Sequence, residues 1–331
     1  MENKEKNIPN KIKGTIYGAL VGNTLASAAI GMTHKDILAT CGINGLKQLT
    51  SSLSKSTYQN HEPGKLLADY YQMQALITPI LNSPNSFTKG KFDKDSIVTS
   101  LVQLLENEAF LDANPSLSAL IALRKMTENT DYCLIGEESI HASGALRSLA
   151  LGLLPKDKYN LIDLALAQAN LTYDDSQMQA SSAVIVNSIS FLLTNDLTSP
   201  DAVKAYINAQ MDLAAQISPK FADAWDNVAP DLDYSEEALV LPYSLINILP
   251  TVDELVPSAV GIFLIFRNNF ESACANAAIA GGATDMAGFL VGALAGAYNG
   301  FDAIPSRWLE KLTHKDEINN LVNNIIGLWD I

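Results

Sequence analysis

The chain has 331 residues, of which 48% are apolar and 18% are charged, and its formal net charge is −14. This composition is typical of a globular protein with a sizeable core and argues against an intrinsically disordered chain. The acidic balance, without any basic stripe, also argues against binding to nucleic acid.

The first residues predict a flexible tail over 1–10, followed by a single domain over 11–331. An apolar run at 16–30 follows several lysines, as in a signal peptide. Two glycines and Asn23 interrupt this run, which favours a helix of the domain over an export signal. The longest apolar run elsewhere, 286–298, is too short to span a bilayer, so we expect no membrane contact.

The cysteines and histidines give no metal or disulfide pattern. Cys41, Cys133 and Cys274 are far apart and form no C-x-x-C pair, which predicts reduced thiols and a cytoplasmic protein. The four histidines are equally scattered, without an H-x-x-x-H motif. A zinc site is therefore not expected.

Apolar residues recur with a helical period along most of the chain, and no convincing run alternates as a half-buried strand does. Ser199 and Pro200 form a helix start, with the serine as N-cap and the proline in the first turn. The predicted helices are 97–111, 161–169, 180–193, 200–217, 257–267, 271–280 and 284–298, and the predicted loops are 44–64, 82–95 and 218–236. The pattern predicts an all-α protein.

Three glycines, Gly288, Gly292 and Gly296, fall four residues apart on one face of a predicted helix. A glycine inside a helix costs about 1 kcal/mol relative to alanine, so three in register need a reason. We expect them to allow close approach of a second helix. Just before them, a Gly-Gly pair at 281–282 ends one helix, and Thr284 and Asp285 begin the next, where free backbone N–H groups favour an anion or a capping carboxylate.

Two stretches share the letters QMQA: ADYYQMQA at 68–75 and YDDSQMQA at 173–180. The second carries adjacent carboxylates, Asp174 and Asp175, beside a hydroxyl, which suits a hard divalent cation. The first carries one carboxylate followed by two tyrosines. From these letters alone, either stretch could belong to a metal site.

Residues 259–309 decide between them, because they resemble a known family pattern. This segment carries an apolar helix, then GGATDM, then GALAGAYNGFDAIPSRWLE, and it resembles the C-terminal signature of the ADP-ribosylglycohydrolase family. Residues 14–26 and 141–154 resemble earlier blocks of the same family in the same order. The resemblance covers nearly the whole chain and implies a single-domain orthogonal bundle of a dozen or more helices.

The family order places ADYYQM in the register of the family's first metal motif, TDDTQM. YDDSQM falls on a different helix, so Asp174 and Asp175 are expected to start that helix rather than to bind a ligand. The resemblance also implies two Mg²⁺ ions between the TDDT segment and the GGDTDT segment, where they hold ribose hydroxyls and a water near the scissile bond.

This chain departs from the family at most of those metal ligands. Ala68, Tyr70 and Tyr71 replace two threonines and an aspartate of the first motif, while Ala283 and Met286 replace an aspartate and a threonine of the second. Alanine and methionine cannot replace oxygen ligands of a hard ion. Only two motif carboxylates remain, so we expect no metal, or Mg²⁺ only where Asp69 and Asp285 retain part of the site.

The leading hypothesis is a catalytically degenerate member, a pseudoenzyme whose cleft binds an ADP-ribose-like ligand, another small ligand or a protein partner. Two tyrosines would fill the former metal pocket or stack on a ring. The residues expected to contact a ligand are Asn23, Tyr70, Tyr71, Ser143, Gly144, Gly281, Gly282 and Thr284.

Two alternatives remain open. Asp69 and Asp285 could act as a catalytic pair on an ADP-ribosyl or related glycosidic bond with one metal or none, and Glu62 could be a third carboxylate. Alternatively, the protein could be structural, as J1-crystallin is within this family. Arg147 is expected to pair with a buried carboxylate, and His141 to be a surface or internally bonded histidine.

Overall fold

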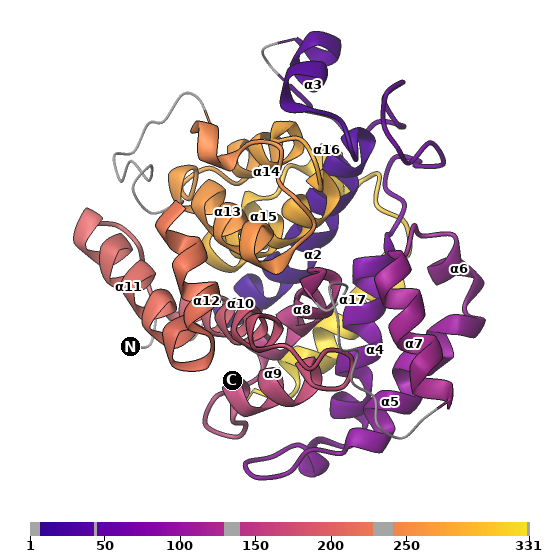
Figure 1. The fold of residues 1–331 in the computed structure, drawn as a ribbon, viewed down its shortest axis with the longest axis vertical. Coiled ribbons are helices and arrows are strands. Elements are labelled where there is room, and N and C mark those ends of the chain that lie inside the picture. The colour runs from indigo at the N-terminus through magenta and orange to yellow at the C-terminus, as the bar shows by residue number, and fades with distance from the viewer. Residues whose placement is uncertain (1–6, 43–44, 129–139, 228–240, 330–331) are drawn as a thin grey trace.

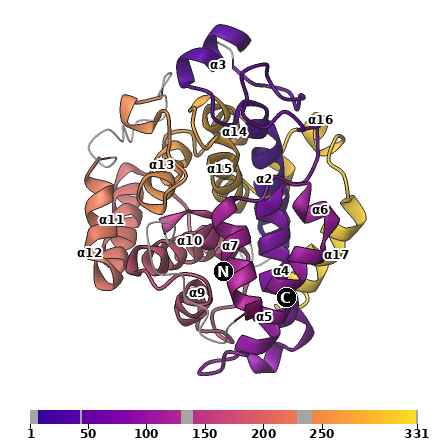
Figure 2. The same cartoon turned by 45° about the vertical axis from the view of Figure 1, so that its right-hand side comes forward.

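Two antiparallel helices, α2 (Ile8–Ala26) and α15 (Thr284–Asn299), lie side by side at the centre of the fold (Figures 1 and 2). A computed structural model describes residues 7–42, 45–128, 140–227 and 241–329. Helices α13 and α14 pack against α15, and α17 packs against α2. Within the described ranges the protein is all-α, since β-structure is limited to two isolated bridges.

The remaining helices surround this central pair, with α4, α5 and α7 on one side and α9 to α12 on another (Figure 2). Their bounds are α3 (His34–Cys41), α4 (Ala68–Asn82), α5 (Lys94–Val102), α6 (Glu108–Leu111), α7 (Leu117–Glu128), α8 (Ser143–Leu146), α9 (Leu161–Ala169), α10 (Ser176–Thr194), α11 (Pro200–Ile217), α12 (Pro219–Asp223), α13 (Val252–Ile265), α14 (Phe270–Ile279), α16 (Ser306–Leu309) and α17 (Lys315–Ile326).

The helical period predicted several of these elements well. Helices α9 and α11 match their predicted bounds, and the Ser199 side chain accepts a hydrogen bond from the Ala202 backbone N–H at 3.2 Å, as expected of an N-cap. The predicted tail is too long, because α2 begins at Ile8, which is buried.

Two predicted helices are wrong in their bounds. The helix expected over 97–111 is interrupted after Val102 by a 3-10 turn, and the Asn107 side chain then caps the short helix α6 by accepting from the Phe110 backbone N–H. The helix expected to start at Pro257 begins at Val252 instead. Proline in the second turn removes only one backbone hydrogen bond, so packing overrides the cost.

Paired glycines explain how α2 and α15 approach each other. A Cβ atom on Gly292 would lie 2.1 Å from the Gly18 carbonyl oxygen, and a Cβ on Gly18 would lie 2.3 Å from the Gly292 carbonyl oxygen. The same reciprocal contact joins Gly22 with Gly288 and Gly14 with Gly296. The close approach predicted from the C-terminal glycines is therefore confirmed, and its partner is a matching glycine row on α2.

A connected hydrophobic core extends from Ile8 to Ile325 around these two helices. The early apolar run lies in this core as part of α2. Within the described part of the chain, no single helix has the length and apolarity to cross a membrane, although Ile8–Ala29 and His34–Cys41, bent by 88°, pass that test as a pair.

Some predictions fall on segments outside the described residues. These are most of the expected tail (1–6), Cys133 and residues 228–236 of the last predicted loop. The two described cysteines, Cys41 and Cys274, are free thiols.

Candidate ligand-binding cavity

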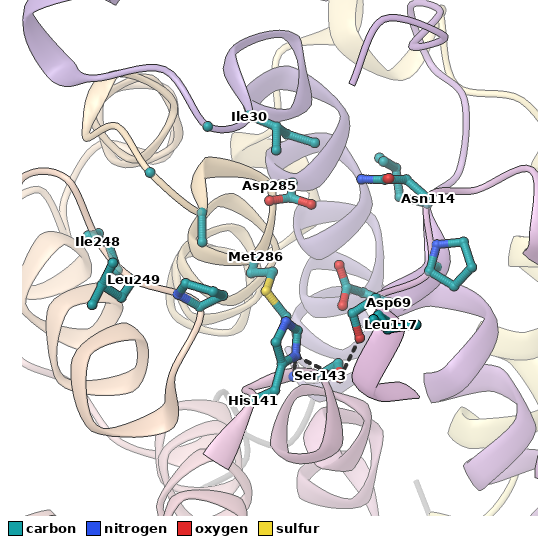
Figure 3. A pocket seen from close by; sticks show the side chains of 18 of the residues that line it. Ile30, Asp69, Asn114, Leu117, His141, Ser143, Ile248, Leu249, Asp285 and Met286 are labelled. Carbon is teal, nitrogen blue, oxygen red and sulfur yellow. Dashed lines mark hydrogen bonds between the residues drawn. The ribbon is translucent and has the colours of Figure 1, made fainter. Parts of the chain in front are cut away.

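A cavity of about 480 Å³ opens where the N-termini of α4 and α15 meet (Figure 3). Its volume lies in the range of small-molecule sites. Six segments line it: the loop before α3, the start of α4, the loop entering α7, the start of α8, the loop before α13 and the start of α15. The lining residues are Ile30, Gly31, Leu67, Ala68, Asp69, Gln72, Asn114, Pro115, Ser116, Leu117, His141, Ser143, Ile248, Leu249, Pro250, Gly282, Ala283, Asp285 and Met286.

Asp69 and Asp285 occupy equivalent positions at the two helix starts. Each is the second residue of its helix, and neither Leu67 nor Ala283 provides a capping side chain. A carboxylate in the first turn interacts favourably with the free N–H groups and the positive end of the helix dipole. This interaction with a helix start explains why each position carries an aspartate, and the fold brings the two aspartates to one cavity.

Asn23 on α2 is hydrogen-bonded to both helix starts. Its side chain is 1% exposed, and its Nδ2 donates to Asp69 Oδ2 at 3.2 Å and to the Asp285 carbonyl oxygen at 3.0 Å. A neutral amide can hold both groups in place, but it cannot neutralise their charge. The two carboxyl groups thus remain electrostatically coupled.

Burial makes both carboxyl groups hard to ionise. It raises the pKa of Asp69 from its ordinary 3.8 to about 7, with a further contribution from the negative charge of Asp285. Burial also raises the pKa of Asp285, to about 6, although backbone N–H groups of its own helix start partly offset that effect. At neutral pH the pair therefore carries less than two full charges.

Hydroxyl and imidazole groups form another wall of the cavity. Nδ1 of His141 lies 3.1 Å from Ser143 Oγ and accepts from the Ser143 backbone N–H at 3.4 Å, while Ser116 Oγ lies 3.4 Å from Ser143 Oγ. Burial lowers the pKa of His141 to about 4, so the ring is neutral at pH 7. Because Nδ1 accepts, the ring proton is on Nε2.

Backbone hydrogen bonds hold three loops together beside the α15 start. The Gly31 N–H donates to the Gly282 carbonyl at 2.9 Å, the Gly282 N–H donates to the Met32 carbonyl at 2.8 Å, and the Ala283 N–H donates to the Ile248 carbonyl at 2.8 Å. These amides are therefore already occupied. The glycine turn serves as a structural junction, which needs the positive φ of +78° at Gly282.

Of the residues predicted to contact a ligand, Ser143 and Gly282 line the cavity, and Asn23 contacts the lining residue Asp69. The two aspartates proposed as a catalytic pair also line it. Thr284 is buried and donates its hydroxyl to the Ala26 carbonyl at 2.8 Å. The two remaining glycines, Gly144 and Gly281, lie against other parts of the chain, where added Cβ atoms would meet Tyr173 and the His34 backbone.

The structure differs from the prediction for the two tyrosines, which do not line the cavity. The Tyr70 hydroxyl donates to Glu317 Oε1 at 3.1 Å, toward α17, and burial raises its pKa well above the ordinary value. Tyr71 packs edge-on against Tyr70 and Phe110. Both rings pack in the core between helices and do not fill the space beside Asp69.

Three other sequence predictions have clear outcomes. Asp175 caps α10, where its Oδ1 accepts from the Gln177 N–H at 2.7 Å, while Asp174 is exposed. Arg147 is buried as expected, but its partners are neutral: Gln168 and Thr172 accept its hydrogen bonds, and no carboxylate of the described residues does. Glu62 is exposed and does not line the cavity.

The residues around the carboxylates do not fit a pair of Mg²⁺ ions. Ala68, Ala283 and Met286 line the cavity beside them and offer no side-chain oxygen. Within the described ranges, no group of three or more His, Cys, Asp and Glu side chains could hold a metal ion. Mg²⁺ requires a near-octahedral set of oxygen ligands, which two carboxylates supply only in small part.

Several lining residues were missed by the sequence analysis, notably Asn114, Ser116 and Leu117, together with Leu249. Three of them belong to loops without a periodic signal, and Leu117 is the first residue of α7. A positive φ of 58° at Asn114 marks one of these loops as a sharp turn, which asparagine tolerates better than most residues. Of the two alternatives predicted for His141, the structure shows the internally bonded one, because its Nδ1 accepts from the Ser143 backbone N–H while the ring lines the cavity.

The structure is an all-helical fold with a cavity between two acidic helix starts. Comparison with known proteins identifies the family with this fold. The family model described as ADP-ribosylglycohydrolase matches residues 4–330. This chain therefore belongs to the ADP-ribosylglycohydrolase family.

Among solved structures, a chain described as "ADP-ribosylglycohydrolase-related protein complex" is similar, with a TM-score of 0.71 and 19% sequence identity. The alignment covers 98% of this chain and 99% of that chain. At this identity the likeness shows the fold alone. A comparison with curated proteins returned no match.

Proposed function

We propose that this protein is a catalytically degenerate member of its family, in which the cavity binds a small ligand without Mg²⁺-dependent hydrolysis. The fold, the cavity and two acidic helix starts are retained. The side chains beside those acids are Ala68, Ala283 and Met286, and the lack of a side-chain oxygen on these three lining residues is the observation that carries the proposal.

The test is release of ADP-ribose from ADP-ribosylated protein in the presence of excess Mg²⁺, combined with calorimetric titration of ADP-ribose. We expect no release above the rate without protein, and the same heat of binding, if any, in Mg²⁺ and in chelator. Mg²⁺-dependent release that Asp69→Asn abolishes would contradict the proposal.

A second candidate function rests on the two raised carboxyl pKa values. Groups with pKa values of about 7 and about 6 that face one cavity are suited to general acid and base catalysis near neutral pH. Two such groups can hydrolyse a glycosidic bond without metal when they are spaced correctly. This residual hydrolase would act on an ADP-ribosyl or related N- or O-glycosidic bond.

Activity that persists in chelator would support the residual hydrolase. Its rate should follow a bell-shaped pH profile, and Asp69→Asn and Asp285→Asn should each remove it. The Asp174→Asn variant is the matched control, because it removes an exposed carboxylate that does not line the cavity. Absence of chelator-resistant turnover in the unmodified protein would leave ligand binding as the function.

A further inference from the structure

The carboxyl groups of Asp69 and Asp285 face the cavity without a cationic partner (Figure 3). Of the ion pairs within the described chain, none includes either aspartate, and the described residues of the cavity lining include no lysine or arginine. Asp69 is 6% exposed, and among the described residues its one side-chain hydrogen-bond partner is the neutral amide of Asn23. Buried carboxylates are normally paired with a cation or a metal.

The same lining is unsuited to phosphate. A nucleoside diphosphate would bring its negative charges toward two acidic groups, and no lysine or arginine among the described lining residues would offset the repulsion. The backbone N–H groups of Gly31, Gly282 and Ala283, which could otherwise bind an anion, already donate to carbonyl groups of neighbouring loops. His141 is neutral and adds no positive charge.

Apolar side chains at the cavity provide the second, independent indication of a ligand. Leu117 is 72% exposed and Leu249 is 51% exposed, which places them among the few large apolar residues of the described chain that are open to solvent. Both line this cavity, and Figure 3 shows them on either side of the carboxylates, with Met286 between. Exposed apolar side chains at a concave site indicate an apolar contact surface.

We propose that the cavity binds an organic cation, in which a positively charged nitrogen lies between Asp69 and Asp285 and an apolar body lies against Leu117 and Leu249. This inference rests on the proposed non-hydrolytic binding function and names its ligand class. The ammonium group would supply the charge that the cavity lacks and would donate hydrogen bonds to both carboxylates. It can belong to a free amine or to a lysine side chain of another protein.

A matched pair of probes tests the charge requirement. Benzylammonium and benzyl alcohol have nearly the same shape, but only the first is charged at neutral pH. We expect calorimetric titration to show binding of benzylammonium about tenfold or more tighter than binding of benzyl alcohol. Nα-acetyl-lysinamide, with Nα-acetyl-norleucinamide as its neutral counterpart, represents a protein side chain, and preference for one cation over the other identifies the source.

Substitutions in the cavity test whether benzylammonium binds there, and a substitution outside the cavity serves as the control. Asp285→Asn and Asp69→Asn should each reduce benzylammonium affinity about tenfold, whereas Asp174→Asn should leave it unchanged. Leu249→Ser should weaken both benzyl probes by a similar factor, since the leucine contacts only the apolar body. Melting temperatures establish that each variant is folded.

The outcomes separate this inference from the function on which it depends. Equal affinity for the charged and neutral probes, or tighter binding of ADP-ribose than of either cation, would overturn the cation assignment while leaving non-hydrolytic binding intact. Mg²⁺-dependent hydrolysis would overturn the proposed function itself. Failure of both cations to bind would also overturn the cation assignment.

Discussion

At the residue scale, Asp69 occupies a position that favours its helix, yet its ionisation in the folded protein is unfavourable. Its position in the first turn of α4 is favourable for helix formation, yet burial and Asp285 together raise its pKa to about 7. The folded chain therefore holds a proton that the unfolded chain releases at a much lower pH. This difference links the protonation of Asp69 to the stability of the protein.

The sign of that link is fixed by the direction of the shift. Because the folded pKa lies above the ordinary 3.8, the free energy of unfolding falls as pH rises from about 4 to about 7, and then levels off. Asp69→Asn removes the group that ionises. We expect this variant to raise the melting temperature relative to the parent at about pH 8 and to change it much less at about pH 5.

A melting series over pH, with Asp174→Asn as the exposed control, checks this prediction. The control should follow the parent at every pH. An Asp69→Asn variant that loses equal stability at both pH values would show instead that the carboxylate is net stabilising when ionised.

The sequence could predict which helix start lies at the cavity, but not which of its side chains point into the cavity. Asp69 and Asp285 could be predicted because each follows a helix start whose register the family motif fixes. Tyr70 could not, because successive helical residues point about 100° apart, so the neighbour of a cavity residue points elsewhere. Its hydroxyl reaches Glu317, a partner far along the chain.

At the element scale, the contact between α2 and α15 depends on glycines from both helices. Gly292→Ala would place a methyl group 2.1 Å from the Gly18 carbonyl oxygen, and neither helix can move without disturbing the core. We expect a loss of about 1–3 kcal/mol in the free energy of unfolding, measured by chemical denaturation.

Gly327→Ala is the matched control for that substitution. An added Cβ at Gly327 would have no neighbour closer than 3.4 Å, which is an ordinary contact distance. Its stability should equal or slightly exceed that of the parent, because alanine reduces the freedom of the unfolded chain. Equal effects at Gly292 and Gly327 would refute the close-packing account.

The Asp174-Asp175 pair gives a second prediction at this scale. Asp175 accepts two backbone N–H groups at the start of α10, so Asp175→Ala should cost about 0.5–2 kcal/mol in thermal or chemical unfolding. The exposed Asp174→Ala should change stability by less than about 0.5 kcal/mol. A large loss of ligand binding in either variant, with stability unchanged, would argue for a role in the site instead.

Helices with a continuous apolar stripe were predictable to within a few residues, as α9 and α11 show. The break after Val102 was not, because the apolar period continues across it and only the capping side chain of Asn107 restarts the helix. The start of α13 was misplaced because Pro257 resembles a first-turn proline. Burial of the residues before it extends the helix instead.

At the scale of the whole molecule, the family fold is present, and apolar side chains lie beside two acidic helix starts. The glycine contact, the hydrophobic core and the cavity surround these two starts. Ala68, Ala283 and Met286 line the cavity, and their departure from the family motifs is what the sequence resemblance implies. The resemblance could predict which helix starts meet, because both motifs can be aligned in the sequence. The loops that complete the cavity match no motif, so their residues could be identified only from the structure.

Titration of Mg²⁺ into the purified protein, followed by calorimetry in the absence of any other ligand, measures whether this cavity holds a metal centre. We expect no saturable heat at millimolar Mg²⁺, because two carboxylates and a neutral amide supply too few oxygen ligands. Saturable binding of two ions per chain, lost in both Asp69→Asn and Asp285→Asn, would contradict the proposed loss of Mg²⁺-dependent hydrolysis and would assign a two-metal centre to this cavity.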